Sequence, residues 1–227
     1  MRKLLSLLAA LLISSAAQAF SLDQLTDKDT AGGLKEALTQ GAGKAVDLLG
    51  KNDGFLGNPK VKIPLPGGLD KAAGMMRNFG MGKYVEELET AMNRAAEAAV
   101  PEAKALLVDS IKKMSVEDAK GVLTGGEDAA TQYFRRTTSE PLGEKFKPII
   151  QKAMAKVNLA EKYDQFAGKA SKFGLVKEKD AHLDGYVTGK ALDGLYTMIA
   201  EEEKAIRSNP VGAAGSLAKK VFGALGN

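Results

Sequence analysis

From Leu34 onward, the apolar residues of this chain recur at spacings of three and four, and almost nowhere do they alternate over the length of a strand. Spacings of three and four place side chains on one face of an α-helix, whereas a half-buried strand needs alternation. The pattern therefore predicts an all-α fold, a compact domain of about eight to ten helices. Val61, Lys62 and Ile63 are the one candidate for a short extended piece, inside a predicted loop over residues 51–66.

The clearest predicted helix covers residues 83–100, with an apolar stripe that includes Val85, Leu88 and Met92. Ser115 with Asp118, Ser139 and Asp184 are predicted to cap the starts of three later helices. Pro148 should kink its helix or break it. Val116 and Thr137 are expected on the buried faces of their helices. The other helices are predicted over residues 30–49, 69–79, 101–114, 116–124, 127–138, 139–157, 159–171, 184–207 and 216–225.

The first residues have the pattern of a secretory signal peptide. Arg2 and Lys3 precede an apolar run of about ten residues, and Ala17-Gln18-Ala19 has the small-x-small pattern of a cleavage site. We expect cleavage after Ala19, export to the periplasm, and a single helical domain over residues 20–227. The chain has no Cys, so it has neither a lipoprotein cysteine nor a disulfide, and no apolar run after Phe20 is long enough to span a membrane.

Charge and composition argue against two classes of function. The 32 Lys and Arg residues are mixed along the chain with 28 Asp and Glu residues, whereas a nucleic-acid binder concentrates its basic residues on one face. The single histidine, His182, lies in no nucleophile motif, and one histidine is too few for a di-iron bundle. We therefore assign no catalytic residue, no metal ligand and no cofactor.

Two sets of polar residues are the candidates for binding a ligand or a partner. Asn93, Arg94 and Glu97 lie roughly opposite the apolar stripe of their predicted helix, at spacings that let their side chains meet. They form either a solvated ion pair or a polar cluster that faces a second layer of helices or a ligand. The second set consists of one carboxylate, one aromatic residue and two arginines: Asp128, Tyr133, Arg135 and Arg136. The guanidinium groups of the arginines can bind a carboxylate or a phosphate bidentately.

Two further acidic segments are interpreted structurally. Thr124-Gly125-Gly126 precedes a helix and would offer backbone N–H groups to an anion, but Glu127 and Asp128 already place negative charge there, which favours a helix cap. Glu201-Glu202-Glu203, with Lys204 and Arg207, is interpreted as a solvated helix end in which Glu203 and Arg207 pair.

Several strings in the chain resemble a bacterial family known as domain of unknown function 4197. They are residues 121–139 (GVLTGGEDAATQYFRRTTS), 92–102 (MNRAAEAAVPE), 62–66 (KIPLP), 191–195 (ALDGL) and 199–203 (IAEEE). The resemblance implies an exported, mainly helical single domain, and it brings no activity, substrate or catalytic residue.

Three functions remain open from the sequence. The leading hypothesis is a non-enzymatic binding or scaffold protein for an envelope partner or a small ligand. The first alternative is a periplasmic enzyme that uses Glu97 or Asp128 with Arg94, Arg135 or Tyr133. The second is an envelope protein held at a membrane surface by its C-terminal amphipathic segment.

Overall fold

The computed structural model describes residues 26–67, 73–74, 77–80, 82–156, 160–161, 163–164, 182–209 and 221. Within these residues the chain forms helices and no strand, which confirms the all-α prediction. The elements are α1 (Asp27–Leu49), α3 (Gly82–Ala99), the 3-10 helix η2 (Val100–Glu102), α4 (Ala103–Lys113), α5 (Val116–Thr124), α6 (Ala129–Met154) and α8 (Leu183–Ser208). They are fewer than the eight to ten helices expected. Three predicted helices, over residues 69–79, 159–171 and 216–225, lie largely outside the described residues.

Helix α6 replaces two predicted helices. Ser139 does not cap a new helix, because it lies inside α6 and its hydroxyl donates to the carbonyl of Arg135 at 2.6 Å. Pro148 also lies inside α6 and does not break it. Side chains on both sides of Pro148, including Phe146 and Ile150, are fully buried, so packing against the core holds the helix together across the missing hydrogen bond.

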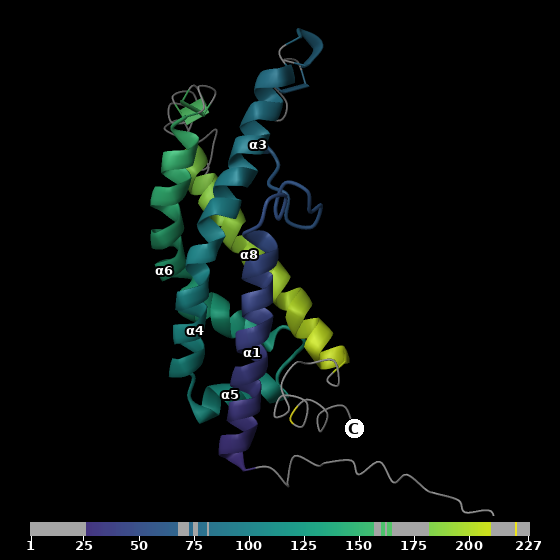
Figure 1. Ribbon diagram of the computed structural model, residues 1–227, viewed down its shortest axis with the longest axis vertical. Coiled ribbons are helices and arrows are strands. Elements are labelled where there is room, and N and C mark those ends of the chain that lie inside the picture. Colours follow the sequence, from purple (N-terminus) through teal and green to yellow (C-terminus); the bar gives the residue numbers. More distant parts are fainter. Residues whose placement is uncertain are drawn as a thin grey trace, which may run out of the picture.

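The long helices α6 and α8 pack along one another, α3 packs on both, and α1 packs on α8 and α4. Figure 1 shows that the start of α3 lies at one end of the longest axis, whereas α5 lies near the opposite end. The apolar stripe predicted for α3 is buried, as are the largest core side chains, which include Phe55, Phe134, Phe146 and Tyr196.

Some side chains differ from their predicted positions. Val116 is 48% exposed although it was expected to face the core. Thr137 was expected to be buried, but it is exposed and the next residue, Thr138, is buried in its place. The predicted capping box of Ser115 and Asp118 is confirmed at α5. Helix α8 starts one residue earlier than predicted, with His182 at its N-cap position, so Asp184 lies in its first turn.

The loop over residues 51–66 crosses from the end of α1 to the region before α3. Residues 61–63 do not form a strand. Phe55 is fully buried against α8 at Gly194, where an added Cβ would lie 2.6 Å from the Phe55 ring. The missing side chain of Gly194 therefore makes the space that the aromatic ring fills.

Candidate functional site

Asn93, Arg94 and Glu97 meet on one side of α3 and bind the loop over residues 51–66; we call these three residues the loop clip. One carboxylate oxygen of Glu97 accepts hydrogen bonds from the backbone N–H groups of Phe55 and Leu56, at 3.0 and 3.1 Å. The other oxygen accepts a bond from Arg94 at 2.6 Å. Glu97 is only 5% exposed, and both of its oxygens accept hydrogen bonds from groups of the protein itself.

Asn93 holds the loop further along, at Ile63. Its side-chain oxygen accepts from the Ile63 N–H at 2.8 Å, and its side-chain nitrogen donates to the Ile63 carbonyl at 2.9 Å. The same nitrogen also donates to the carbonyl of Glu89. The fully buried amide thus supplies both hydrogen bonds that a neighbouring strand would give to one extended residue.

Arg94 completes the loop clip. Its second terminal nitrogen donates to Asp53 at 2.8 Å, and Asp53 has a positive φ of 63°. The Glu97 carboxylate, followed by Asp53, raises the pKa of the Arg94 guanidinium above its ordinary value. The guanidinium therefore stays charged and links α3 to the start of the loop.

A second buried carboxylate, Glu203, lies where the sequence predicted a solvated helix end. One oxygen of Glu203 accepts from the N–H of Ala130, and the other accepts from the N–H and the hydroxyl of Thr131, all at 2.8 to 2.9 Å. Glu203 is 5% exposed and pairs with Arg207 at 2.8 Å, as the i,i+4 spacing predicted. Arg207 also donates to the carbonyl of Val122 in α5. We call Glu203 and Arg207 the helix clip.

The helix clip corrects one prediction and explains another. Glu203 is buried, as is its neighbour Glu202, which pairs with Lys44 of α1 at 2.7 Å. The expected solvated helix end is therefore wrong for both residues. At the start of α6, the backbone N–H groups that would attract an external anion are bound by the carboxylate of Glu203, because a helix N-terminus favours negative charge.

In the second set of candidates, each arginine lies against a tyrosine ring, and the carboxylate is exposed. The Arg136 guanidinium lies 5.5 Å from the Tyr133 ring, and the buried Tyr133 hydroxyl donates to the carbonyl of Ser110. Arg135 lies 4.6 Å from the ring of Tyr196. Asp128 is exposed and accepts a hydrogen bond from Gln132.

The structure brings some of these candidates together. Asp128 and Arg135 both line a surface depression of about 340 Å³, which also includes Tyr196, Glu201 and Lys204. None of four depressions on the described part of the chain is lined by both Glu97 and Arg135. The pairing of Glu97 with Arg135, one form of the enzyme alternative, is therefore not seen in these four depressions, whereas the pairing of Asp128 with Arg135 in one depression is.

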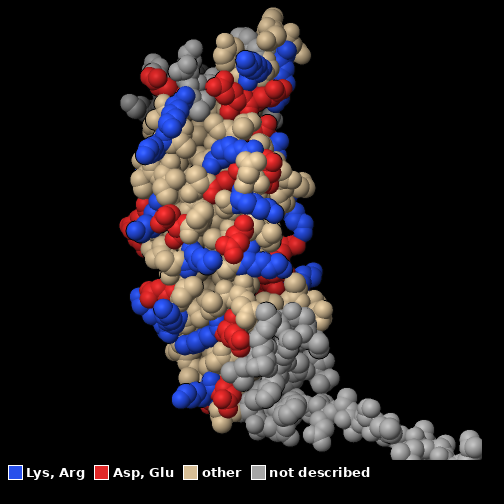
Figure 2. Space-filling model, in the orientation of Figure 1, with Lys and Arg blue, Asp and Glu red and all other residues tan. Residues whose placement is uncertain are grey.

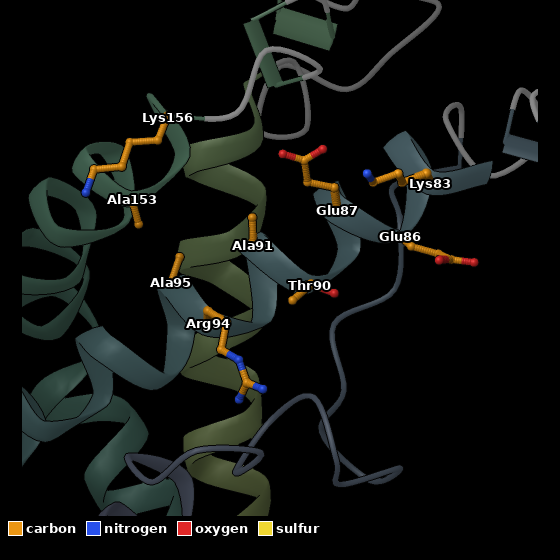
Figure 3. A pocket seen from close by; sticks show the side chains of 9 residues that line it. All are labelled: Lys83, Glu86, Glu87, Thr90, Ala91, Arg94, Ala95, Ala153 and Lys156. Atoms are coloured by element: carbon orange, nitrogen blue, oxygen red, sulfur yellow. The ribbon is translucent and has the colours of Figure 1, made fainter. Parts of the chain in front are cut away.

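A larger depression, of about 650 Å³, lies between α3 and the end of α6, and we call it the α3–α6 groove. Its floor contains the small side chains Ala91, Ala95 and Ala153, as Figure 3 shows. Charged residues form its rim: Lys83, Glu86, Glu87, Arg94 and Lys156. In Figure 3, the Arg94 side chain is directed toward the loop.

Sequence reasoning missed Glu203 and Gly194, although the chain contains a signal for the glutamate. Glu203 follows Ile199 by four residues and precedes Ile206 by three, so it lies on the apolar stripe of α8. A carboxylate on a buried stripe needs hydrogen-bond donors inside the protein. Every buried side-chain nitrogen or oxygen in the described residues has a hydrogen-bond partner.

The described residues contain neither a candidate metal site nor a helix suited to span a membrane. No three or more His, Cys, Asp or Glu side chains there are grouped closely enough to hold a metal ion. No helix in the same residues combines the length and the apolar character needed to cross a membrane.

Comparison with known proteins identifies a family and nothing further. No curated protein matched the sequence, and no solved structure matched it. Residues 24–223 match the family described as "Protein of unknown function (DUF4197)", in agreement with the resemblance seen in the sequence. Because the match covers most of the 227 residues, the chain belongs to this family.

Proposed function

We propose that this protein is an exported, non-enzymatic helical protein that binds a partner in the bacterial envelope. The observation that carries this proposal is that the loop clip and the helix clip both bind the protein's own backbone. Among the described residues, Glu97 and Glu203 are the least exposed acidic residues, at 5% each, and their carboxylates hold the protein's own backbone N–H groups. Their role is to fix the loop over residues 51–66 and the start of α6.

Export is supported by the sequence alone. The basic, apolar and small-residue segments of residues 1–19 occur in the order of a signal peptide, and residues 20–227 then form the mature single domain. A chain in that compartment without Cys relies on burial and hydrogen bonds for its stability. The two clips supply such hydrogen bonds between segments that are distant in the sequence.

The α3–α6 groove is the surface that we assign to the partner. An apolar floor inside a charged rim has the arrangement of a protein interface, in which a desolvated centre is surrounded by a polar border. Small side chains on the floor let a segment of another protein approach the helix backbone closely. The partner is therefore expected to be an envelope protein that places a helix or an extended segment along α3.

The test compares the same substitution at two positions of α3. Ala91 lines the groove, whereas Ala98 is exposed and does not line it. Ala91→Arg should abolish the crosslinks that the protein forms in the periplasm, because the long cation fills the floor, and Ala98→Arg should leave them unchanged. If both variants keep the wild-type crosslinks, the groove is not the partner site.

One observation favours the enzyme alternative, namely the depression that Asp128 and Arg135 share with Tyr196. A carboxylate next to a guanidinium can bind and polarise a substrate. If the wild-type protein converts a component of a periplasmic extract, and Asp128→Asn and Arg135→Gln both abolish that conversion, the enzyme alternative replaces the binding proposal. The conversion is followed by mass spectrometry of the extract.

A further inference from the structure

The segment before α3 and the first turn of α3 carry exposed aromatic residues at one end of the molecule. Phe79 is 78% exposed and Tyr84 is 59% exposed, and they are the two most exposed of the large hydrophobic residues in the described chain. Gly80 turns the backbone between them with a φ of 74°, a conformation that glycine adopts readily. The turn leaves Phe79 directed away from the core.

Positive charge accompanies these aromatic residues. Arg77 and Lys83 flank Phe79 and are exposed, and neither forms an ion pair with a described carboxylate. In the sequence, no acidic residue occurs between Asp70 and Glu86, although acidic residues are common elsewhere. Figure 2 shows positive and negative charges interleaved over the visible face, and both signs are also present near the end of the molecule where α3 starts.

We propose that Arg77, Phe79, Lys83 and Tyr84 form a membrane-surface contact that binds anionic phospholipid headgroups. Aromatic rings insert at the boundary between headgroups and acyl chains, and neighbouring cations attract anionic lipids. Within residues 71–85 every charged side chain is basic, which favours an anionic lipid surface, and the acidic Glu86 and Glu87 follow on the rim of the α3–α6 groove.

The start of α3 lies at the end of the longest axis, where a bilayer can reach it. Lys83 also lies on the rim of the α3–α6 groove, whereas Arg77, Phe79 and Tyr84 do not line it. Because the two rings and Arg77 do not line that groove, the test of this contact does not depend on the partner proposed above.

The chain has no tryptophan, so a single substitution gives a specific fluorescent probe. The test uses mature Phe79→Trp protein and vesicles of phosphatidylglycerol mixed with phosphatidylcholine. The emission should shift to shorter wavelength and be quenched by brominated lipid, and high salt should reverse both effects. The matched control is Val116→Trp, which places the probe at another exposed apolar position, in α5 near the other end of the molecule. Its emission should not change.

Vesicle sedimentation supplies the second measurement. The Phe79→Ser/Tyr84→Ser variant should lose binding by about tenfold, because both interfacial rings are removed. Both positions are exposed, so its circular dichroism should match that of the wild type. The proposal is overturned if wild-type protein does not bind anionic vesicles, if the double variant binds them equally well, or if the tryptophan of the Phe79→Trp variant stays in water while the protein sediments. The last result would place the contact elsewhere, for example at the C-terminal segment.

Discussion

Glu203 illustrates how a carboxylate on an apolar helix face obtains hydrogen-bond donors inside the protein. It accepts hydrogen bonds from Ala130 and Thr131 and pairs with Arg207. Glu203→Gln keeps the size of the side chain but leaves the guanidinium, which is 18% exposed, without its counter-charge. We expect the free energy of unfolding to fall by about 3 kcal/mol, measured by urea denaturation.

The matched control for Glu203→Gln is Glu201→Gln, two residues earlier on α8. Glu201 pairs with Lys60 at the surface, where solvent screens the interaction. This variant should unfold at the same urea concentration as the wild type. Equal effects of the two substitutions would show that the buried carboxylate does not stabilise the start of α6.

Asp118 allows a prediction about pH. The hydrogen bonds from the Ser115 hydroxyl and backbone N–H lower the pKa of the Asp118 carboxyl below its ordinary value. Because the folded pKa lies below the unfolded one, the ionised cap stabilises the protein above the unfolded pKa, and this contribution is lost as the pH falls through the folded pKa. Ser115→Ala should raise the pKa of Asp118 toward its ordinary value in an NMR titration. An unchanged titration curve would contradict the capping box.

At the residue scale, the sequence predicted the contact between Arg94 and Glu97, because helical spacing alone decides which side chains are neighbours. It did not predict what Asn93 and Glu97 bind. The partners Phe55 and Ile63 lie in a loop some 30 to 42 positions away, and no local pattern encodes that contact. The general rule that a buried carboxylate needs donors does not identify which donors those are.

At the scale of elements, the loop over residues 51–66 depends on the glycine beneath Phe55. An added Cβ at Gly194 would lie 2.6 Å from one ring atom of Phe55 and 3.3 Å from Val61. Gly194→Ala should therefore displace the ring and lower the free energy of unfolding by about 1–3 kcal/mol, measured by urea denaturation.

Gly189→Ala is the matched control on the same helix. Its added methyl group would meet nothing within 4 Å, so it should raise stability by about 0.5–1 kcal/mol through helix propensity. If Gly194→Ala is also stabilising, Phe55 does not need the space that we assign to it.

Helix boundaries were predicted best where a local signal ends the helix. The end of α1 before Gly50 and the start of α5 after Ser115 follow from cap residues. The continuity of α6 did not follow, because Ser139 and Pro148 are local signals for a boundary and packing overrides both. The number of helices was overestimated in part for this reason.

At the scale of the whole molecule, the strings that carry the family resemblance meet at the two clips. Residues 92–102 and 62–66 supply Asn93, Glu97 and Ile63 at the loop clip, and residues 191–195 supply Gly194 beneath the same loop. Residues 121–139 and 199–203 meet where Glu203 binds the start of α6. These strings thus supply contacts that join distant segments of the fold.

Native mass spectrometry of the protein isolated gently from the periplasm tests the central claim most directly. The account predicts a chain that begins at Phe20 and carries an additional mass, a bound protein or small ligand, that is lost on denaturation. An unprocessed chain recovered from the cytoplasm would contradict export. A processed chain that stays bare in the native spectrum and after crosslinking would contradict the binding function.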